Sequence, residues 1–188
     1  YNLVWSTTFN YTRGDGYYEN YKAGKSFGKY MMQNPVIDGK EYEEGDFITR
    51  EALANDYLVL NSDLRYRSGM LDLTAGINLS RYDGDHIGSV IWNDVLGDSF
   101  DYDSHEWYLN NGLKREVSTF VRAEARPWSW LTAFADLQYR GIFLDMEGPE
   151  YGVSLDYSTQ WHFFNPRAGL SFSWNPRNRA YFSAAAGH

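Results

Sequence analysis

The sequence predicts an all-β fold in which antiparallel up-and-down strands form part of a transmembrane β-barrel. Three observations favour it. Seven segments alternate apolar and polar residues, short turns alternate with long polar segments, and aromatic side chains gather at both ends of the apolar faces. A strand that faces lipid on one side and water on the other has this period of two residues.

The alternation can be followed through each of the seven segments. In residues 131–140, for example, Leu131 and Leu137 share one face while Asp136 and Arg140 lie on the other. A helical stripe with a period of 3.6 residues would have to include Arg or Asp, so an amphipathic helix is disfavoured. The seven expected strands are 1–13, 56–67, 70–82, 115–126, 131–140, 163–174 and 179–187.

The connections between these strands are alternately short and long. Tight turns are expected at 68–70, 127–129 and 175–178, and long loops at about 14–52, 84–112 and 146–162. In a membrane barrel the short turns are periplasmic, so the long loops are expected to be extracellular. About seven strands make an incomplete barrel, and the chain opens and closes within strand patterns. Residues 1–188 are therefore expected to be a single segment of a larger barrel, with open edges that pair with another copy or another β-segment.

The polar faces and the aromatic residues bear on the choice between a barrel and a soluble sandwich. Acids and arginines occupy neighbouring levels of the polar faces, as Asp72 does beside Arg65, which suits a wet lumen. A solvated outer face of an ordinary sheet would also be polar, so a β-sandwich stays open on this evidence alone. Two aromatic belts favour a bilayer. They comprise Tyr66, Trp128, Trp130 and Trp174 at the turn end, and Tyr11, Tyr139 and Phe164 near the loop end.

Composition excludes several other classes of protein. The formal net charge is −8 and no basic cluster occurs, so a nucleic-acid partner is not expected. Cysteine is absent, which removes disulfides, thiolate catalysis and cysteine-ligated metals. The sequence contains no run of 18 apolar residues, so a transmembrane helix is not predicted.

No motif predicts an enzyme, and no catalytic residue is expected. Ser26-Phe27-Gly28-Lys29 matches a Ser-x-x-Lys pattern without the companion motifs that its chemistry needs. Gly97-Asp98-Ser99 resembles the start of an esterase motif but lacks a strand–turn–helix setting. Neither a phosphate-binding loop nor a zinc-binding His-Glu-x-x-His occurs, and no cofactor is expected.

Aromatic and histidine side chains of the long loops are the candidate ligand-binding residues. Their planar rings could stack on a sugar or another ligand, and the same rings could instead fold the loops onto one another. A loop-borne metal site is a weaker alternative, and no metal-ligating residue is assigned. The candidates are Trp92, His105, Trp107, Tyr108, Trp161 and His162.

Several stretches resemble TonB-dependent outer-membrane receptors of the Bacteroides type. They are Tyr11-Thr12-Arg13-Gly14-Asp15-Gly16-Tyr17-Tyr18-Glu19-Asn20-Tyr21-Lys22, Arg81-Tyr82-Asp83-Gly84-Asp85-His86-Ile87-Gly88, Val90-Ile91-Trp92, His105-Glu106-Trp107-Tyr108, Ala135-Asp136-Leu137-Gln138-Tyr139-Arg140, Asn165-Pro166-Arg167-Ala168-Gly169-Leu170-Ser171 and Trp174-Asn175-Pro176-Arg177-Asn178. These stretches are dispersed over most of the chain.

The resemblance implies a 22-stranded barrel in the bacterial outer membrane, closed by an N-terminal plug. Such a receptor takes up a scarce ligand, which is an iron chelate, a cobamide or a glycan, with energy that TonB delivers. The implied partners are outer-membrane lipid, the rest of the barrel and its plug, the TonB system, and the small-molecule or glycan ligand. The alternative function is that of a secreted, soluble β-sandwich that binds glycans.

Overall fold

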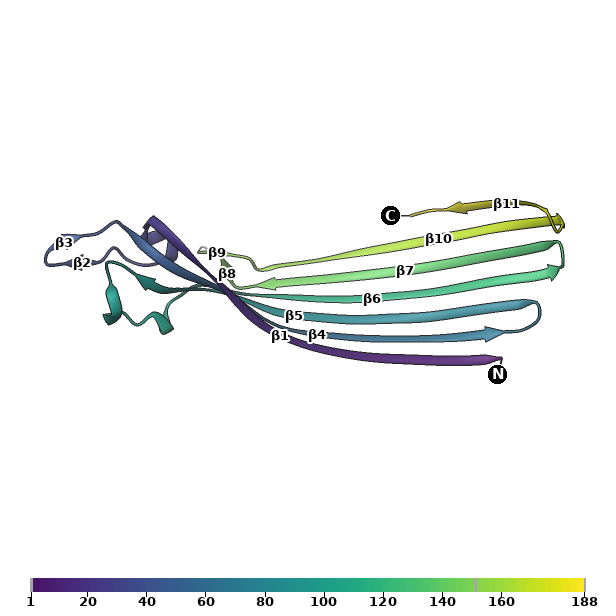
Figure 1. The fold of residues 1–188 in the computed structure, drawn as a ribbon, viewed down its shortest axis with the longest axis horizontal. Helices are drawn as coiled ribbons and strands as arrows, with labels where there is room; N and C mark the ends of the chain where they lie inside the picture. Colours follow the sequence, from purple (N-terminus) through teal and green to yellow (C-terminus); the bar gives the residue numbers. More distant parts are fainter. Residues whose placement is uncertain (1, 151, 188) are drawn as a thin grey trace.

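The computed structural model describes residues 2–150 and 152–187, apart from the side chains of Ser99 and Ser104. With 80% strand and 4% helix, it confirms the all-β fold. Seven long strands form one antiparallel sheet, in which every strand lies beside the next long strand along the chain (Figure 1). The sheet has this up-and-down order and is not closed.

The long strands meet at tight turns on one end and at longer connections on the other (Figure 1). They are β1 (Leu3–Ser26), β4 (Glu44–Arg67), β5 (Leu71–Asn93), β6 (Glu106–Trp128), β7 (Leu131–Glu147), β10 (Tyr157–Asn175) and β11 (Asn178–Ala185). The longer connections hold two small hairpins and three short 3-10 helices. These are β2 (Val36–Ile37) with β3 (Lys40–Glu41), β8 (Pro149–Glu150) with β9 (Val153–Ser154), and the helices Phe27–Tyr30, Gly97–Ser99 and Tyr102–Ser104.

The loops are shorter than the sequence predicted, because the strands continue into them. Pairing of β1 with β4 runs on from Gly14↔Asn55 to Ser26↔Glu44, in a region expected to be loop. Likewise β5 extends to Asn93 and β6 begins at Glu106. The connections between the long strands are therefore 27–43, 94–105 and 148–156, in place of 14–52, 84–112 and 146–162.

One face of the sheet is apolar in every strand, as the alternation predicted. Register aligns these residues into rows across the sheet, which we call the apolar face. One row is Trp5, Leu64, Ala75, Val121, Leu137 and Pro166, and the next toward the turns is Leu3, Tyr66, Leu73, Ala123, Ala135, Ala168 and Ala184. A slip of one residue in any strand would break these rows, so the hydrophobic pattern fixes the register.

The opposite face, the polar face, carries the alternate residues. One of its rows is Asn61, Asn78, Ser118 and Arg140, and another is Arg65, Thr74, Arg122, Asp136 and Arg167. Ion pairs cross between neighbouring strands, for example Arg140 with Glu116 at 2.8 Å and Arg167 with Asp136 at 2.8 Å. The expected pairing of acids and arginines at neighbouring levels is confirmed.

The packed core of the molecule lies at the loop end of this sheet. The buried apolar residues are Phe27, Tyr30, Phe47, Val90 and Trp107, which we call the loop core. Besides the large sheet, the described residues contain only two small hairpins, each made of two strands of two residues. The two packed sheets of a sandwich are therefore not found there. None of the described helices has the length and hydrophobicity to span a bilayer.

Candidate ligand-binding site

Aromatic rings of three different segments build the loop core. Tyr30, from the 3-10 helix after β1, packs against Phe47 of β4 and Trp107 of β6, with ring centroids 4.7 and 5.0 Å apart. Phe27 meets Phe47 edge to face at 5.1 Å. Edge-to-face aromatic contacts add stability beyond their buried area, so the loops between the long strands are held together at this end.

Hydrogen bonds tie the second loop, 94–105, to this core. The buried Asn93 side chain donates to the Asp46 carbonyl at 2.9 Å and accepts from the amides of Val95 and Leu96, both at 3.0 Å. The Tyr102 hydroxyl donates to the Gly97 carbonyl at 2.9 Å, and burial raises the pKa of this hydroxyl. The hydroxyl therefore stays protonated at neutral pH and can donate this hydrogen bond.

A cavity of about 780 Å³, the loop-end pocket, lies beside the loop core. Its lining comes mainly from the polar-face ends of β1, β4, β5 and β6. Two glycines of β1 line it without side chains: space is open for 4 Å around a Cβ built on Gly16, and one on Gly14 would lie 3.0 Å from Asn55 Oδ1. A volume of this size suits a small-molecule or oligosaccharide ligand.

Polar groups of several strands converge on this pocket. The Tyr18 hydroxyl donates a short hydrogen bond to the Glu51 carboxylate across β1 and β4. The His86 ring donates from Nδ1 to the Asn110 amide oxygen at 2.9 Å, across β5 and β6. Carboxylate, amide, hydroxyl and imidazole groups around an open, partly aromatic cavity can bind a hydroxyl-rich ligand by hydrogen bonds and ring contacts.

Tyr108 is the sequence-predicted candidate that lines the loop-end pocket. Its ring lies over Gly88 of the neighbouring strand, where an added Cβ would be 2.3 Å from the tyrosine Cε1. The same Cβ would be 2.7 Å from Trp107 Cε2. Gly88 thus allows the two rings to approach the backbone of β5, and this approach sets one wall of the pocket.

Two other candidates do not line the pocket and belong to the loop core or contact it. Trp107 is 3% exposed and belongs to the loop core, so it does not present a free ring to a ligand. His105 donates from Nε2 to the Tyr30 carbonyl at 2.7 Å and so joins the two longest loops. For these two residues the structure favours the alternative that they fold the loops onto one another.

The remaining candidates lie outside the pocket. Trp92 pairs with Ile48, and Trp161, which is exposed, pairs with Ile142 of β7. His162 hydrogen-bonds with the Tyr139 hydroxyl through Nδ1 at 2.7 Å. The structure therefore does not bring the six candidates together in one site.

The pocket residues that the sequence analysis missed lie in segments expected to be loops or directly beside one. Tyr18, Glu51, Asn55 and Asn110 are strand residues on the polar face. Their signal in the sequence is weak, because polar and apolar residues are mixed on both faces beyond Gly14, as where Gly16 pairs with Leu53 and Lys22 with Phe47. Among the described residues no three His, Asp or Glu side chains form a group that could hold a metal ion.

No family model matches the chain, and no curated protein matches it either.

Proposed function

We propose that residues 1–188 form part of the barrel wall of a TonB-dependent receptor in the bacterial outer membrane, which takes up a scarce ligand. The apolar face meets the lipid, the polar face lines the lumen, and the three longer connections lie outside the cell. The observation that carries this proposal is the large apolar face that no other part of the described chain covers.

The side chains of that face are exposed although they are apolar. Trp5 is 74% exposed, Phe9 65% and Phe182 70%, and they belong to the first strand and the last. A soluble monomer rarely exposes apolar area continuously over seven strands, because burying it gains about 25 cal/mol per Å². Lipid contact supplies that burial without a second packed layer.

The spacing of the aromatic belts supports a sheet that spans the membrane. On β4 the turn-end residue Tyr66 and Leu58, the partner of Tyr11, are eight positions apart. At roughly 3.3 Å per residue this is about 26 Å along the strand, close to the apolar band of about 25 Å in outer-membrane barrels. At the turn end Trp128 and Trp130 stack with centroids 5.4 Å apart, which suits an interfacial belt.

Three hollows follow one another along the polar face. The loop-end pocket is followed by a second hollow of about 480 Å³, lined by amide and hydroxyl side chains such as Asn78, Ser118 and Gln138. A third, of about 670 Å³, lies at the turn end and is lined by arginines. Polar groups at three levels of this face could contact a polar ligand in succession, and transport along the lumen involves no chemical reaction.

The absence of cysteine makes the membrane orientation directly testable. Leu137 and Gln138 are consecutive residues on opposite faces of β7, and each can be replaced by a single cysteine. In outer membranes, Leu137→Cys should react slowly with a water-soluble maleimide and readily with a lipid-soluble one, whereas Gln138→Cys should show the reverse order. Equal reactivity of both positions with the water-soluble reagent, or recovery of the protein outside the membrane fraction, would refute the proposed orientation.

The ligand class is tested by uptake. A strain that lacks the gene should lose growth on one of the three candidate sources, an iron chelate, a cobamide or a glycan. Complementing this strain with the Tyr108→Ala or the Glu51→Gln variant should support weaker growth than complementing it with the wild-type gene, because both residues line the loop-end pocket. Trp161→Ala is the matched control, since this exposed aromatic residue lies outside the pocket. Normal growth of the deletion strain on all three sources would contradict the proposed uptake.

A further inference from the structure

The hollow at the turn end, which we call the arginine pocket, differs in charge from the rest of the chain. Its volume is about 670 Å³, and its charged lining consists of Arg65, Arg67, Arg122, Arg126, Asp72 and Glu124. Four guanidinium groups and two carboxylates give the lining a net charge of +2, whereas the whole chain carries −8. The local field therefore favours an anion in an otherwise acidic protein.

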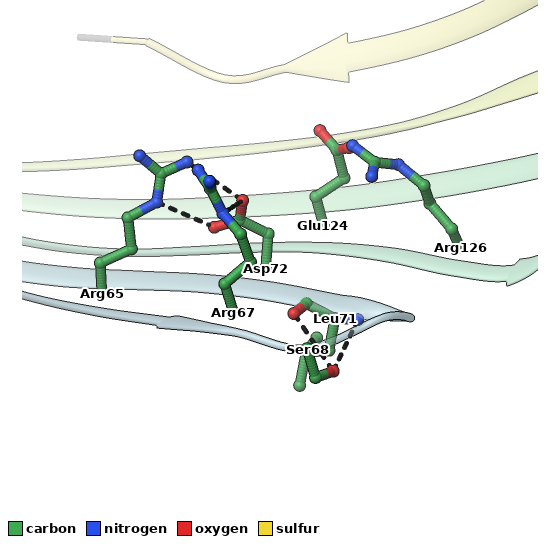
Figure 2. Close-up of polar contacts among 7 residues, drawn as sticks. All are labelled: Arg65, Arg67, Ser68, Leu71, Asp72, Glu124 and Arg126. Atoms are coloured by element: carbon green, nitrogen blue, oxygen red, sulfur yellow. Dashed lines mark hydrogen bonds and ion pairs between the residues drawn. The ribbon is translucent and has the colours of Figure 1, made fainter. Parts of the chain in front are cut away.

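The two carboxylates leave part of this positive charge unpaired. Asp72 accepts from Arg65 Nε at 3.3 Å and Nη2 at 3.1 Å, and also from Arg67 Nε at 3.0 Å (Figure 2). One carboxylate thus serves two arginines. Glu124 is engaged by Arg126, two positions along the same strand (Figure 2).

Donor groups remain on the two sides of β5. On β4, Arg67 uses Nε alone, and its terminal nitrogens have no partner among residues 2–150 and 152–187. On β6, the exposed Arg122 makes neither a hydrogen bond nor an ion pair within the same described ranges. Its neighbour in the register, the buried Asp136, binds Arg167 through Oδ2 at 2.8 Å. The Oδ1 atom of Asp136 has no hydrogen-bond partner in the described part of the chain, so Arg122 does not bind it.

The geometry of the sheet sets the distance that a ligand must bridge. Arg67 and Arg122 lie on strands separated by β5 alone and are offset by two positions in the register, because Arg122 is level with Arg65. At roughly 4.8 Å per strand and 3.3 Å per residue, their backbones are about 12 Å apart. Thr74 of β5 lies between them in the lining, and Phe120 closes the side toward the middle of the sheet. Long arginine side chains can converge from both sides over such a floor.

We propose that the arginine pocket binds a small anion with two or more carboxylate groups. A guanidinium group presents paired N–H donors that match a carboxylate, and Arg65 already holds Asp72 in this bidentate way. Arg67 and Arg122 can each hold one carboxylate group of the ligand. This site follows from the charges and the register of the sheet, and it does not depend on whether the apolar face meets lipid.

Calorimetric titration of the purified protein with citrate tests the site, at a constant ionic strength of about 0.1 M to limit screening. Citrate should bind at least tenfold more tightly than acetate, which can engage only one guanidinium group. Arg122→Gln should weaken citrate binding about tenfold. The matched control, Arg177→Gln, removes a positive charge from the same end of the sheet but outside the pocket, and should leave the affinity unchanged.

Further arms of the same titration make every outcome decisive. Arg122→Lys keeps the charge and loses the paired donors, so its affinity for citrate should fall between those of the wild type and Arg122→Gln. If Arg122→Gln does not fold, Arg122→Lys takes its place in the comparison. Absence of citrate binding at millimolar concentration would overturn the proposal. So would equal weakening by Arg177→Gln, which would indicate a diffuse field, or tighter binding of inorganic phosphate than of citrate, which would exclude carboxylate selectivity.

Discussion

Aromatic rings lie directly over glycines at several points on the polar face. Phe120 pairs with Gly76, and Phe134 pairs with Gly169, each across one strand boundary. A Cβ on either glycine would lie 2.5 Å from the Cε1 atom of the facing ring. A glycine weakens a strand because it has no side chain to pack, and the facing ring replaces that missing contact.

We expect Gly76→Ala to destabilise the protein by about 1 kcal/mol, because the added methyl group forces the Phe120 ring out of its place. Gly16→Ala is the matched control, since a Cβ at Gly16 meets open space. Denaturant unfolding of both variants measures the difference. In a Phe120→Ala background the penalty at Gly76 should disappear, and a penalty that persisted there would contradict this explanation.

Asp46 links three elements at the loop end. Its carboxylate accepts hydrogen bonds from the Tyr21 hydroxyl and, at 2.8 Å, from the Gly24 amide at the bulge of β1. Its own amide donates to Asp94 Oδ1 at 2.8 Å. The Tyr21 hydroxyl and then the Gly24 amide favour the ionised carboxylate, so they lower the pKa of Asp46 below its ordinary value of 3.8.

Because this pKa is lowered on folding, the stabilisation by Asp46 is present above pH 3.8 and is lost as the pH falls through the folded-state pKa. Asp46→Asn should therefore speed amide hydrogen exchange in residues 20–26 at pH 7. In the wild type the same loss of protection should appear only below pH 3.8. Asp38→Asn, the same change in the turn between β2 and β3, is the control. Unchanged exchange in Asp46→Asn at pH 7 would contradict the role of this carboxylate.

The sheet as a whole ends in two edges. Within the described residues β1 pairs only with β4 and β11 only with β10, so each leaves a row of backbone hydrogen-bonding groups without a strand partner. Twenty-four residues of β1 form the longer edge. A long edge strand is a template for pairing with another strand.

We expect the isolated 188-residue chain to associate through these edges. In detergent, its apparent mass in sedimentation velocity should rise with protein concentration. A further β-segment that completes the sheet should suppress this association. A monomer at every concentration would contradict edge pairing.

The alternation of residues predicted the strand type, the order of the sheet and the two faces, because in the apolar band every second residue is hydrophobic. It failed beyond Gly14 and before Asn55, where polar and apolar residues are mixed on both faces while the backbone pairing continues. The site was predicted less well. Trp107 and His105 were recognised as loop residues of interest, but sequence alone does not show whether such a ring packs inward, and both serve the loop core.

The position of the loop core has a consequence for the thermodynamics of capture. Since Tyr30, Phe47 and Trp107 pack together through contacts of the chain itself, the surroundings of the loop-end pocket are preorganised. A ligand then pays little conformational entropy for ordering loops. Its association should be fast, and its heat-capacity change should come from its own contacts with the pocket, because no loop has to fold and bury apolar surface when it arrives.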